Sequence, residues 1–168
     1  FEKRILIVAA AGNERSNSDI YGFFPDGYNY SNILSVAAVN VNGRLIASSN
    51  YGNKNVSLSA PGENILSYLP SKKLGLMSGT SQATAFASGT AALYMQTLDF
   101  KVDPRQVILH LINTAEKSTH LRGKVQSEGY INGFRALRMK NSNSTAFGAI
   151  IINDYDNPND FYSADSNL

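Results

Sequence analysis

Several residue types and kinds of segment are absent from this sequence of 168 residues, and each absence excludes a class of site or partner. There is no cysteine, so the protein has neither disulfides nor thiolate metal sites. The longest apolar runs, Ile5–Ala11 and Ala146–Ile152, are seven residues long, which is too short for a helix that crosses a bilayer. No run of basic residues is interleaved with aromatic ones, so we expect no nucleic-acid partner.

The start of the chain also lacks the features of a primary translation product. It begins at Phe1 rather than at methionine, and its first residues do not have the layout of a signal peptide. We therefore expect a processed product or a fragment of a longer protein. The absence of cysteine fits an exported protein as well as many cytosolic ones, and we predict a secreted or extracytoplasmic location.

The remaining composition is that of a folded domain with an acidic end. Hydrophobic residues make up 43% of the chain and charged residues 17%, a balance typical of globular rather than disordered proteins. Residues 1–140 carry all fifteen basic and nine of the thirteen acidic side chains, a net charge of +6, whereas residues 141–168 carry four aspartates and no basic residue, a net charge of −4. This change predicts a domain over 1–140 and an acidic tail over 141–168, in which Ala146–Ile152 could form one extra strand.

Apolar runs bounded by turn residues predict strands, and longer stretches with helical spacing predict helices. Ile33–Val39 is apolar except for one serine, which is typical of a strand buried on both faces in a parallel sheet. Further strands are expected at Ile5–Ala11, at Arg44–Ala47 after an Asn42-Gly43 turn, at Val56–Ala60 and, as a short edge strand, at Ile65–Leu69. Helices are expected at Ser81–Leu98, at Pro104–Ala115 with Asp103 as its N-cap, and at Asn132–Met139. This order predicts an α/β fold of three layers, with a mostly parallel sheet and helices on both faces.

The stretch from Ser78 to Gly89 combines a serine with a helix of small residues. Ser81 lies at the predicted first turn, where backbone N–H groups lack intrahelical acceptors and the helix dipole is positive. An oxyanion formed by attack of its hydroxyl on a carbonyl would be stabilised there. Small residues at 83, 85, 87, 89, 91 and 92 would let the helix lie close to a sheet. The alternative interpretation is that Ser81 is only a helix N-cap.

Several motifs around this serine resemble those of the subtilisin-like serine proteases. Gly79-Thr80-Ser81, Ala83-Thr84 and Gly89 are similar to the signature around the family's nucleophile, and Val8–Glu14 is similar to the strand and turn that present its oxyanion asparagine. Ile33–Val39, Ser48–Gly52, Ser59–Gly62, Pro104–Ala115 and Gly129–Leu137 are similar to further segments of the family in the same order. The resemblance covers residues 4–139, which correspond to the C-terminal half of a catalytic domain.

The resemblance implies hydrolysis of peptide bonds in polypeptide substrates by a Ser–His–Asp triad, with no required cofactor. By position, Ser81 would be the nucleophile, and the side-chain amide of Asn13 would be the oxyanion donor. Ala10, Ala11 and Gly12 would line the wall of the first specificity pocket. Without the resemblance, an asparagine after Gly12 is more simply a turn residue.

The sequence departs from the family in two respects. Ala85-Phe86 replaces the usual Pro-His after the nucleophile, and Gln82 replaces a methionine, changes that remove no catalytic group. The triad order in this family is Asp, His, Ser, yet only twelve residues precede Asn13. Of the two histidines, His110 is predicted to be structural within a helix, and His120 is predicted to be solvated. We therefore assign no triad histidine or aspartate to this chain.

The missing triad members have two expected consequences. The Ser81 hydroxyl would stay protonated and weakly nucleophilic, so the chain alone should be inactive. The strand Ile5–Ala11 would expose an unpaired edge where the first half of the sheet belongs. We expect an N-terminal companion segment or chain that carries the triad aspartate and histidine.

Two other functions fit parts of the sequence. A pseudoprotease could keep this scaffold and bind a peptide or a subunit without catalysis, although the retention of Ser81 and Asn13 favours the enzyme. A different α/β-hydrolase is disfavoured, because Ala83 stands where a Gly-x-Ser-x-Gly elbow requires its last glycine.

No residue is assigned as a metal ligand, but two segments could bind a structural calcium ion. Asn153–Asp160 is rich in oxygen ligands, although Pro158 and a missing glycine break the EF-hand pattern. Phe24-Pro25 resembles a family position that often holds a cis proline near a cation-binding loop.

Overall fold

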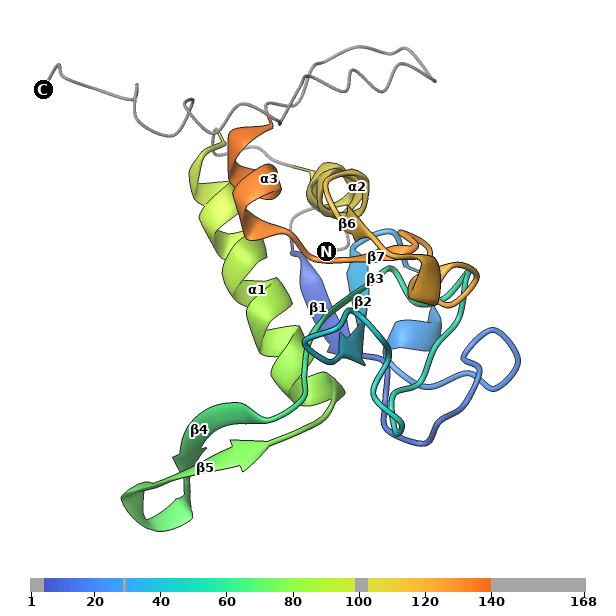
Figure 1. Ribbon diagram of the computed structural model, residues 1–168. Coiled ribbons are helices and arrows are strands. Elements are labelled where there is room, and N and C mark those ends of the chain that lie inside the picture. Colours follow the sequence, from blue (N-terminus) through green and yellow to red (C-terminus); the bar gives the residue numbers. More distant parts are fainter. Residues whose placement is uncertain (1–4, 29, 99–102, 140–168) are drawn as a thin grey trace, which may run out of the picture.

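The computed structural model describes residues 5–28, 30–98 and 103–139 (Figure 1). The predicted acidic tail, with its expected strand at Ala146–Ile152 and the oxygen-rich segment Asn153–Asp160, lies outside the described residues. None of the helices within the described ranges has the length and apolarity needed to cross a membrane.

The main sheet has five strands and is mostly parallel. Its strands lie in the order β1 (Ile7–Ala10), β2 (Ile33–Val39), β3 (Leu58–Pro61), β7 (Gly129–Tyr130) and β6 (Glu116–Lys117). The first four run parallel to one another, and β6 is antiparallel to β7. Every residue of β2 is buried, as its apolar sequence predicts, because this strand has neighbours on both edges and side chains packed on both faces.

Three α-helices pack on one face of this sheet. They are α1 (Thr80–Gln96), α2 (Pro104–Asn113) and α3 (Gly133–Arg138), and α1 lies along the sheet with α3 beside its C-terminal half (Figure 1). The core on this side joins Leu34, Val36 and Ala38 of β2 to all three helices. The other face is covered by a smaller cluster of Ala37 and Val39 with loop residues and Leu121 of the short helix η3 (Thr119–Leu121). The α/β fold with a mostly parallel sheet is confirmed.

Side-chain caps begin two of the helices, and that of Asp103 is the one predicted from the sequence. The Asp103 side chain accepts a hydrogen bond from the Arg105 N–H at 3.0 Å, and Pro104 is the first residue of α2. The Asn132 side chain likewise accepts from the Arg135 N–H at 3.0 Å at the start of α3. These side chains satisfy backbone donors that a helix leaves without partners.

The strand predicted at Arg44–Ala47 is wrong. Only Leu45 bridges back to Val39, because the Asn40 side chain accepts hydrogen bonds from the N–H groups of Asn42 and Arg44 and closes a tight turn. The segment after the bridge leaves the sheet and folds against the end of β1, where Asn50 N–H donates to the Gly12 carbonyl at 2.9 Å.

The short edge strand predicted at Ile65–Leu69 is confirmed, and it lies outside the main sheet. The segment forms strand β4 (Ile65–Leu69), which pairs only with the antiparallel β5 (Lys73–Met77), in a separate two-stranded hairpin. The turn between them is the short helix η2 (Pro70–Lys72). Figure 1 shows the hairpin projecting from the body at the N-terminal end of α1.

The small residues of α1 divide between two faces of the helix. Ala83, Ala87 and Ala91 are buried against the sheet, as helical spacing of four requires. Ala85, Gly89 and Ala92 are exposed, so only some of the small residues that predict a close approach to the sheet lie at the contact.

Both histidines have the environments predicted for them. His110 is buried, its ring stacks on Tyr94 with 3.9 Å between centroids, and its Nε2 lies 2.8 Å from the Ala136 carbonyl oxygen. It therefore ties α1, α2 and α3 together. His120 is exposed and accepts a hydrogen bond from the Arg44 Nε at 3.4 Å.

The Tyr94 hydroxyl generates a pH-dependent prediction. It is buried without a hydrogen-bond partner among the described residues, and its burial raises the pKa of the phenol above the ordinary value. The folded protein therefore binds this proton more tightly than the unfolded chain, so Tyr94 lowers the free energy of unfolding as pH rises above about 10. Tyr94→Phe should raise the free energy of unfolding by about 1 kcal/mol at pH 7 and reduce its fall between pH 9 and pH 11. Urea titrations at both ends of this range measure the effect; equal alkaline losses in the two proteins would contradict the assignment.

Gly62 generates a second prediction, because it lies where β3 ends beneath the first turn of α1. A Cβ atom at this position would lie 2.7 Å from both the Ala38 Cβ and the Gly79 carbonyl oxygen. Gly62→Ala should lower the free energy of unfolding by about 1–3 kcal/mol through overpacking. Gly22→Ala is the matched control, since its nearest neighbour would be a Phe24 ring atom at 3.8 Å, and it should have little effect. Chemical denaturation of the full-length proteins compares the two.

Candidate active site

The candidate site lies where the carboxyl ends of the parallel strands meet the start of α1. After β1 ends at Ala10, the chain turns sharply through Ala11, Gly12 and Asn13. Gly12 has φ +101°, and a Cβ atom there would collide with the side-chain amide of Asn50. Only glycine fits this position, because both the backbone conformation and the space exclude a side chain.

The turn holds Asn13 against the first residue of α1. The Thr80 N–H donates to the Asn13 Oδ1 at 3.0 Å, and the Thr80 Oγ1 also lies 3.3 Å from that oxygen. The Gly12 N–H donates to the Thr80 Oγ1 at 3.2 Å. Residues 68 positions apart are therefore joined by hydrogen bonds, and the sequence-predicted site residues Asn13 and Ser81 are brought to one place.

Only the oxygen of the Asn13 side-chain amide has a hydrogen-bond partner among the described residues. Its oxygen serves as the cap that Gly79, the N-cap residue of α1, cannot supply from a side chain. Its nitrogen has no acceptor among the described residues, and the side chain is solvent-exposed. The NH₂ group is thus left as a donor toward the surface beside α1.

Ser81 lies in the first turn of α1 and is exposed. Its own N–H is among the donors that a helix start leaves without an intrahelical acceptor. The first turn carries no acidic side chain, so nothing there opposes the positive end of the helix dipole. An anion placed beside Ser81 and Asn13 would meet two N–H donors and a favourable field. The arrangement can stabilise an oxyanion.

The three residues predicted to line a substrate pocket differ in exposure. Ala10 and Gly12 are half-buried, whereas Ala11 is fully buried in the smaller core cluster. Ala11 has no exposed surface, and its N–H and carbonyl bond to the Val36 carbonyl and to the Asn50 side chain, so of the three residues only Ala10 and Gly12 are accessible to a substrate.

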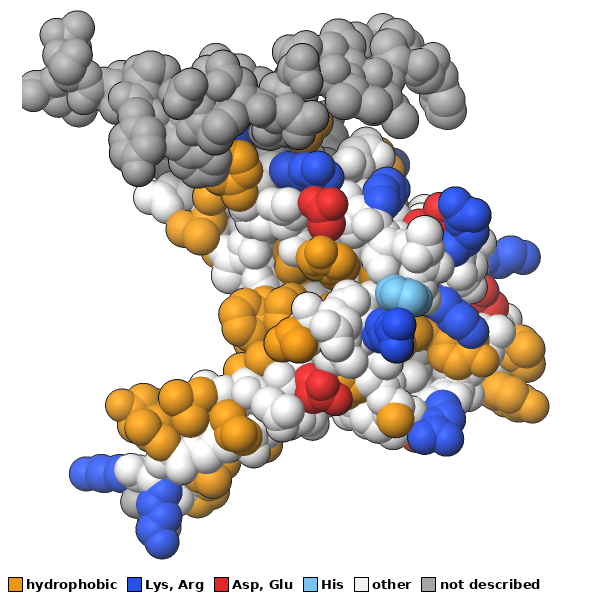
Figure 2. All heavy atoms as spheres, in the orientation of Figure 1, with side chains coloured by type: hydrophobic (Ala, Val, Ile, Leu, Met, Phe, Trp, Pro, Cys, Tyr) orange, Lys and Arg blue, Asp and Glu red, His pale blue; other side chains and the backbone are white. Residues whose placement is uncertain are grey.

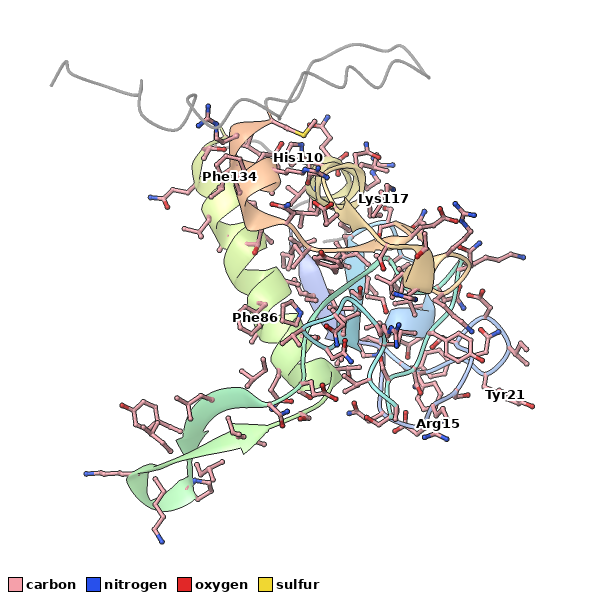
Figure 3. The ribbon with its side chains drawn as sticks, viewed as in Figure 1. Arg15, Tyr21, Phe86, His110, Lys117 and Phe134 are labelled. Atoms are coloured by element: carbon pink, nitrogen blue, oxygen red, sulfur yellow. The ribbon has the colours of Figure 1, made fainter. Side chains whose placement is uncertain are left out.

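Neither histidine of the chain can serve Ser81 as a base. His110 stacks on Tyr94, thirteen residues further along α1, which corresponds to about 20 Å along the helix axis. Figure 3 shows His110 at the α2–α3 end of the molecule, away from Phe86 in the N-terminal part of α1. His120 lies beside Arg44 in η3, on the face of the sheet opposite to α1.

The described residues contain no group of three or more His, Cys, Asp or Glu side chains that could hold a metal ion. The Phe24-Pro25 peptide bond is cis, as its resemblance to the family position predicts.

The sequence did not single out the roles of Thr80 and Asn50 at this site. Ser48–Gly52 and Gly79-Thr80-Ser81 were matched only as segments, and nothing in their composition indicates that their polar groups bond across the fold to the turn at Gly12. The contacts arise only once β1, the segment after β2 and α1 are packed together.

Comparisons with known proteins agree with this geometry. The model of the subtilase family matches residues 1–148. The chain is similar to the thermophilic serine proteinase of Bacillus sp. AK1 (34% identity over 82% of this chain and 32% of that protein) and to subtilisin BL of Lederbergia lenta (34% over 80% and 46%). The major intracellular serine protease of Bacillus subtilis is 43% identical over 53% of this chain and 28% of its own length.

Solved protein structures are also similar to this chain. The A-subunit of the AB5 toxin from E. coli superposes with a TM-score of 0.70 and 29% identity over 79% of this chain and 49% of that one. The self-cleaved protease domain of PatA superposes with a TM-score of 0.61 and 31% identity over 80% and 49%. The chain thus spans less than half the length of these three curated relatives and about half of these solved chains.

The family match over residues 1–148 includes the turn at Asn13 and the helix that begins at Thr80, and on this ground the chain belongs to the subtilase family.

Proposed function

We propose that this chain is part of a serine endopeptidase that hydrolyses polypeptide substrates, with Ser81 as nucleophile and Asn13 as oxyanion donor. The observation that carries the proposal is the hydrogen bond from the Thr80 N–H to the Asn13 Oδ1. It holds the Asn13 side-chain amide at Thr80, next in sequence to the exposed Ser81, and leaves the amide nitrogen without an acceptor among the described residues. The relatives named as serine proteases support the same reaction class.

The chemistry follows from these two residues and a base. The Ser81 Oγ attacks the carbonyl carbon of a peptide bond, and the base takes its proton. The resulting oxyanion accepts hydrogen bonds from the Asn13 Nδ2 and from the Ser81 N–H. The base then gives the proton to the leaving amine, and water hydrolyses the acyl-enzyme by the same steps in reverse order. Ala10 and Gly12 would contact the substrate residue before the cleaved bond, whereas Ala11 is buried.

The base and its aspartate would come from an N-terminal companion segment or chain. Three unpartnered surfaces support this part of the proposal. Among the described strands, β1 pairs only with β2, so one of its edges is open. The outer face of α1 exposes Phe86 and Leu93. The hairpin exposes Leu66, Tyr68, Leu74 and Leu76 by 60–78%.

The apolar surfaces lie on one side of the molecule. Leu66 pairs with Leu76 and Tyr68 pairs with Leu74, so these four residues form one apolar face of the hairpin. Figure 2 shows apolar side chains along the hairpin and along the flank of α1, with the surface hollowed between them. A two-stranded hairpin is marginally stable without further packing. A companion bound in this hollow would cover the apolar face of the hairpin and the flank of α1.

The location of the protein stays a prediction. We propose a secreted or extracytoplasmic location from the sequence alone, since two of the relatives are named as intracellular proteases and lend it no support.

Labelling by a fluorophosphonate probe tests the catalytic proposal. The probe should label Ser81 in the protein that includes its upstream segment and should leave residues 1–168 alone unlabelled. Ser81→Ala should abolish labelling. Asn13→Ala should lower kcat about a hundredfold to a thousandfold, the loss that removal of one such donor causes in a subtilisin. Absence of labelling with the upstream segment present would instead indicate a pseudoprotease.

Co-purification tests the companion. Residues 1–168 should elute as aggregates or with incomplete secondary structure in size-exclusion chromatography and circular dichroism, and should form a defined species with the upstream segment. Leu76→Asp should weaken this association at least tenfold, because it places a charge on the apolar face of the hairpin. Val41→Asp is the control, since Val41 is 94% exposed in the turn after β2. A stable, monodisperse monomer of residues 1–168 would contradict the proposal.

A further inference from the structure

We propose that Asn50 is a positioning residue for the oxyanion donor Asn13, an inference that rests on the proposed function. Asn50 is completely buried and belongs to the segment Ser48–Gly52, which the sequence matched to the family without a role. It does not touch Asn13 itself. It bonds to the residues on both sides of it.

Five hydrogen bonds connect Asn50 to the turn. Its Nδ2 donates to the Ala11 carbonyl at 2.8 Å and to the Glu14 Oε2 at 2.8 Å. Its Oδ1 accepts from the Glu14 N–H at 3.0 Å and from the Ser16 N–H at 2.9 Å. Its backbone N–H donates to the Gly12 carbonyl at 2.9 Å. Both hydrogens and both lone pairs of the side-chain amide are therefore used by one loop.

The partners determine the orientation of the amide. Two carbonyl or carboxylate oxygens lie at one end and two N–H groups at the other, so the reverse orientation would oppose donor to donor and acceptor to acceptor. Aspartate, leucine or serine could not reproduce the four contacts. A carboxamide of this length is required at position 50.

Asn50 is in turn fixed to the sheet. The Ser49 Oγ donates to the Asn50 carbonyl at 2.9 Å and accepts from the Ala38 N–H of β2 at 3.0 Å. The loop that carries Asn13 is thereby held on the central strand, while Thr80 holds Asn13 from the side of α1. Catalytic groups must stay within a fraction of an ångström of their productive position. The hydrogen bonds from Asn50 to the residues around Asn13, which we call the clamp, supply that constraint for the turn.

A buried asparagine could instead serve stability alone, and a matched control separates the two roles. Asn32 is also buried, and its Nδ2 donates to the Ile5 carbonyl at 3.0 Å, at the opposite end of β1. Asn32→Ala removes a buried amide that bonds to the chain just before β1, without touching the turn at Asn13.

The test uses the full-length protein with its upstream segment. Active sites are titrated with a fluorophosphonate, and kcat per titrated site and KM are measured on a chromogenic peptide. Asn50→Ala should lower kcat per site about tenfold to a hundredfold with KM nearly unchanged, whereas Asn32→Ala should leave kcat per site within about twofold. In an Asn13→Ala background, Asn50→Ala should cost less than about threefold, because it acts through Asn13. An unchanged kcat per site, or an equal loss in both backgrounds, would overturn the inference.

A second variant and a second readout cover other outcomes. If Asn50→Ala does not fold, Glu14→Ala removes one acceptor of the clamp at an exposed residue; it should also lower kcat per site, and full activity would overturn the inference. If the wild-type protein neither labels nor cleaves, the proposed function fails, and amide hydrogen exchange still tests the clamp. Exchange at the Glu14 and Ser16 N–H groups should rise at least tenfold in Asn50→Ala and not in Asn32→Ala, and unchanged exchange would refute it.

Discussion

The hydrogen bond between the Thr80 N–H and the Asn13 Oδ1 is the interaction on which the rest of the site depends. A carboxamide has an acceptor end and a donor end, and only one of them is consumed here. The oxygen caps a helix whose N-cap residue is a glycine with no side chain to offer. The same bond holds the side chain at Thr80, next in sequence to Ser81, and leaves the nitrogen without an acceptor among the described residues. One side chain therefore completes the helix and remains available to an anion.

Close packing of the helix on the sheet makes this bond possible. The start of α1 approaches the ends of β2 and β3 because the contact residues are Ala38, Gly62 and Ala83. The Gly79 N–H donates to the Gly62 carbonyl at 2.8 Å, a distance that a side chain on Gly62 would prevent. Ligands of parallel α/β sheets bind at the carboxyl ends of the strands, and here small residues bring the helix start to that end.

Much of the fold could be predicted from local signals, and the failures share one physical cause. The buried strand Ile33–Val39 and the Asp103-Pro104 helix start were predicted because an apolar run and a cap act within a few residues. Ile65–Leu69 was predicted as an edge strand, but its partner Lys73–Met77 was not, because the pairing depends on the turn at Pro70–Lys72. The resemblance predicted Ser81 and Asn13 as a site. The role of Asn50 was not predicted, because its hydrogen bonds join residues more than thirty positions apart.

The surfaces left uncovered divide the proposed reaction between two parts of the protein. The described residues hold the groups that stabilise charge, and these are already in place through bonds to β2 and α1. Neither of their two histidines lies near Ser81 to act as a base. The chemical barrier would therefore be lowered only when a companion covers the hollow between α1 and the hairpin and brings a base to the hydroxyl. Because the oxyanion donors are held independently of that event, association needs to supply only proton transfer, and the free energy of covering the apolar hairpin face would drive it.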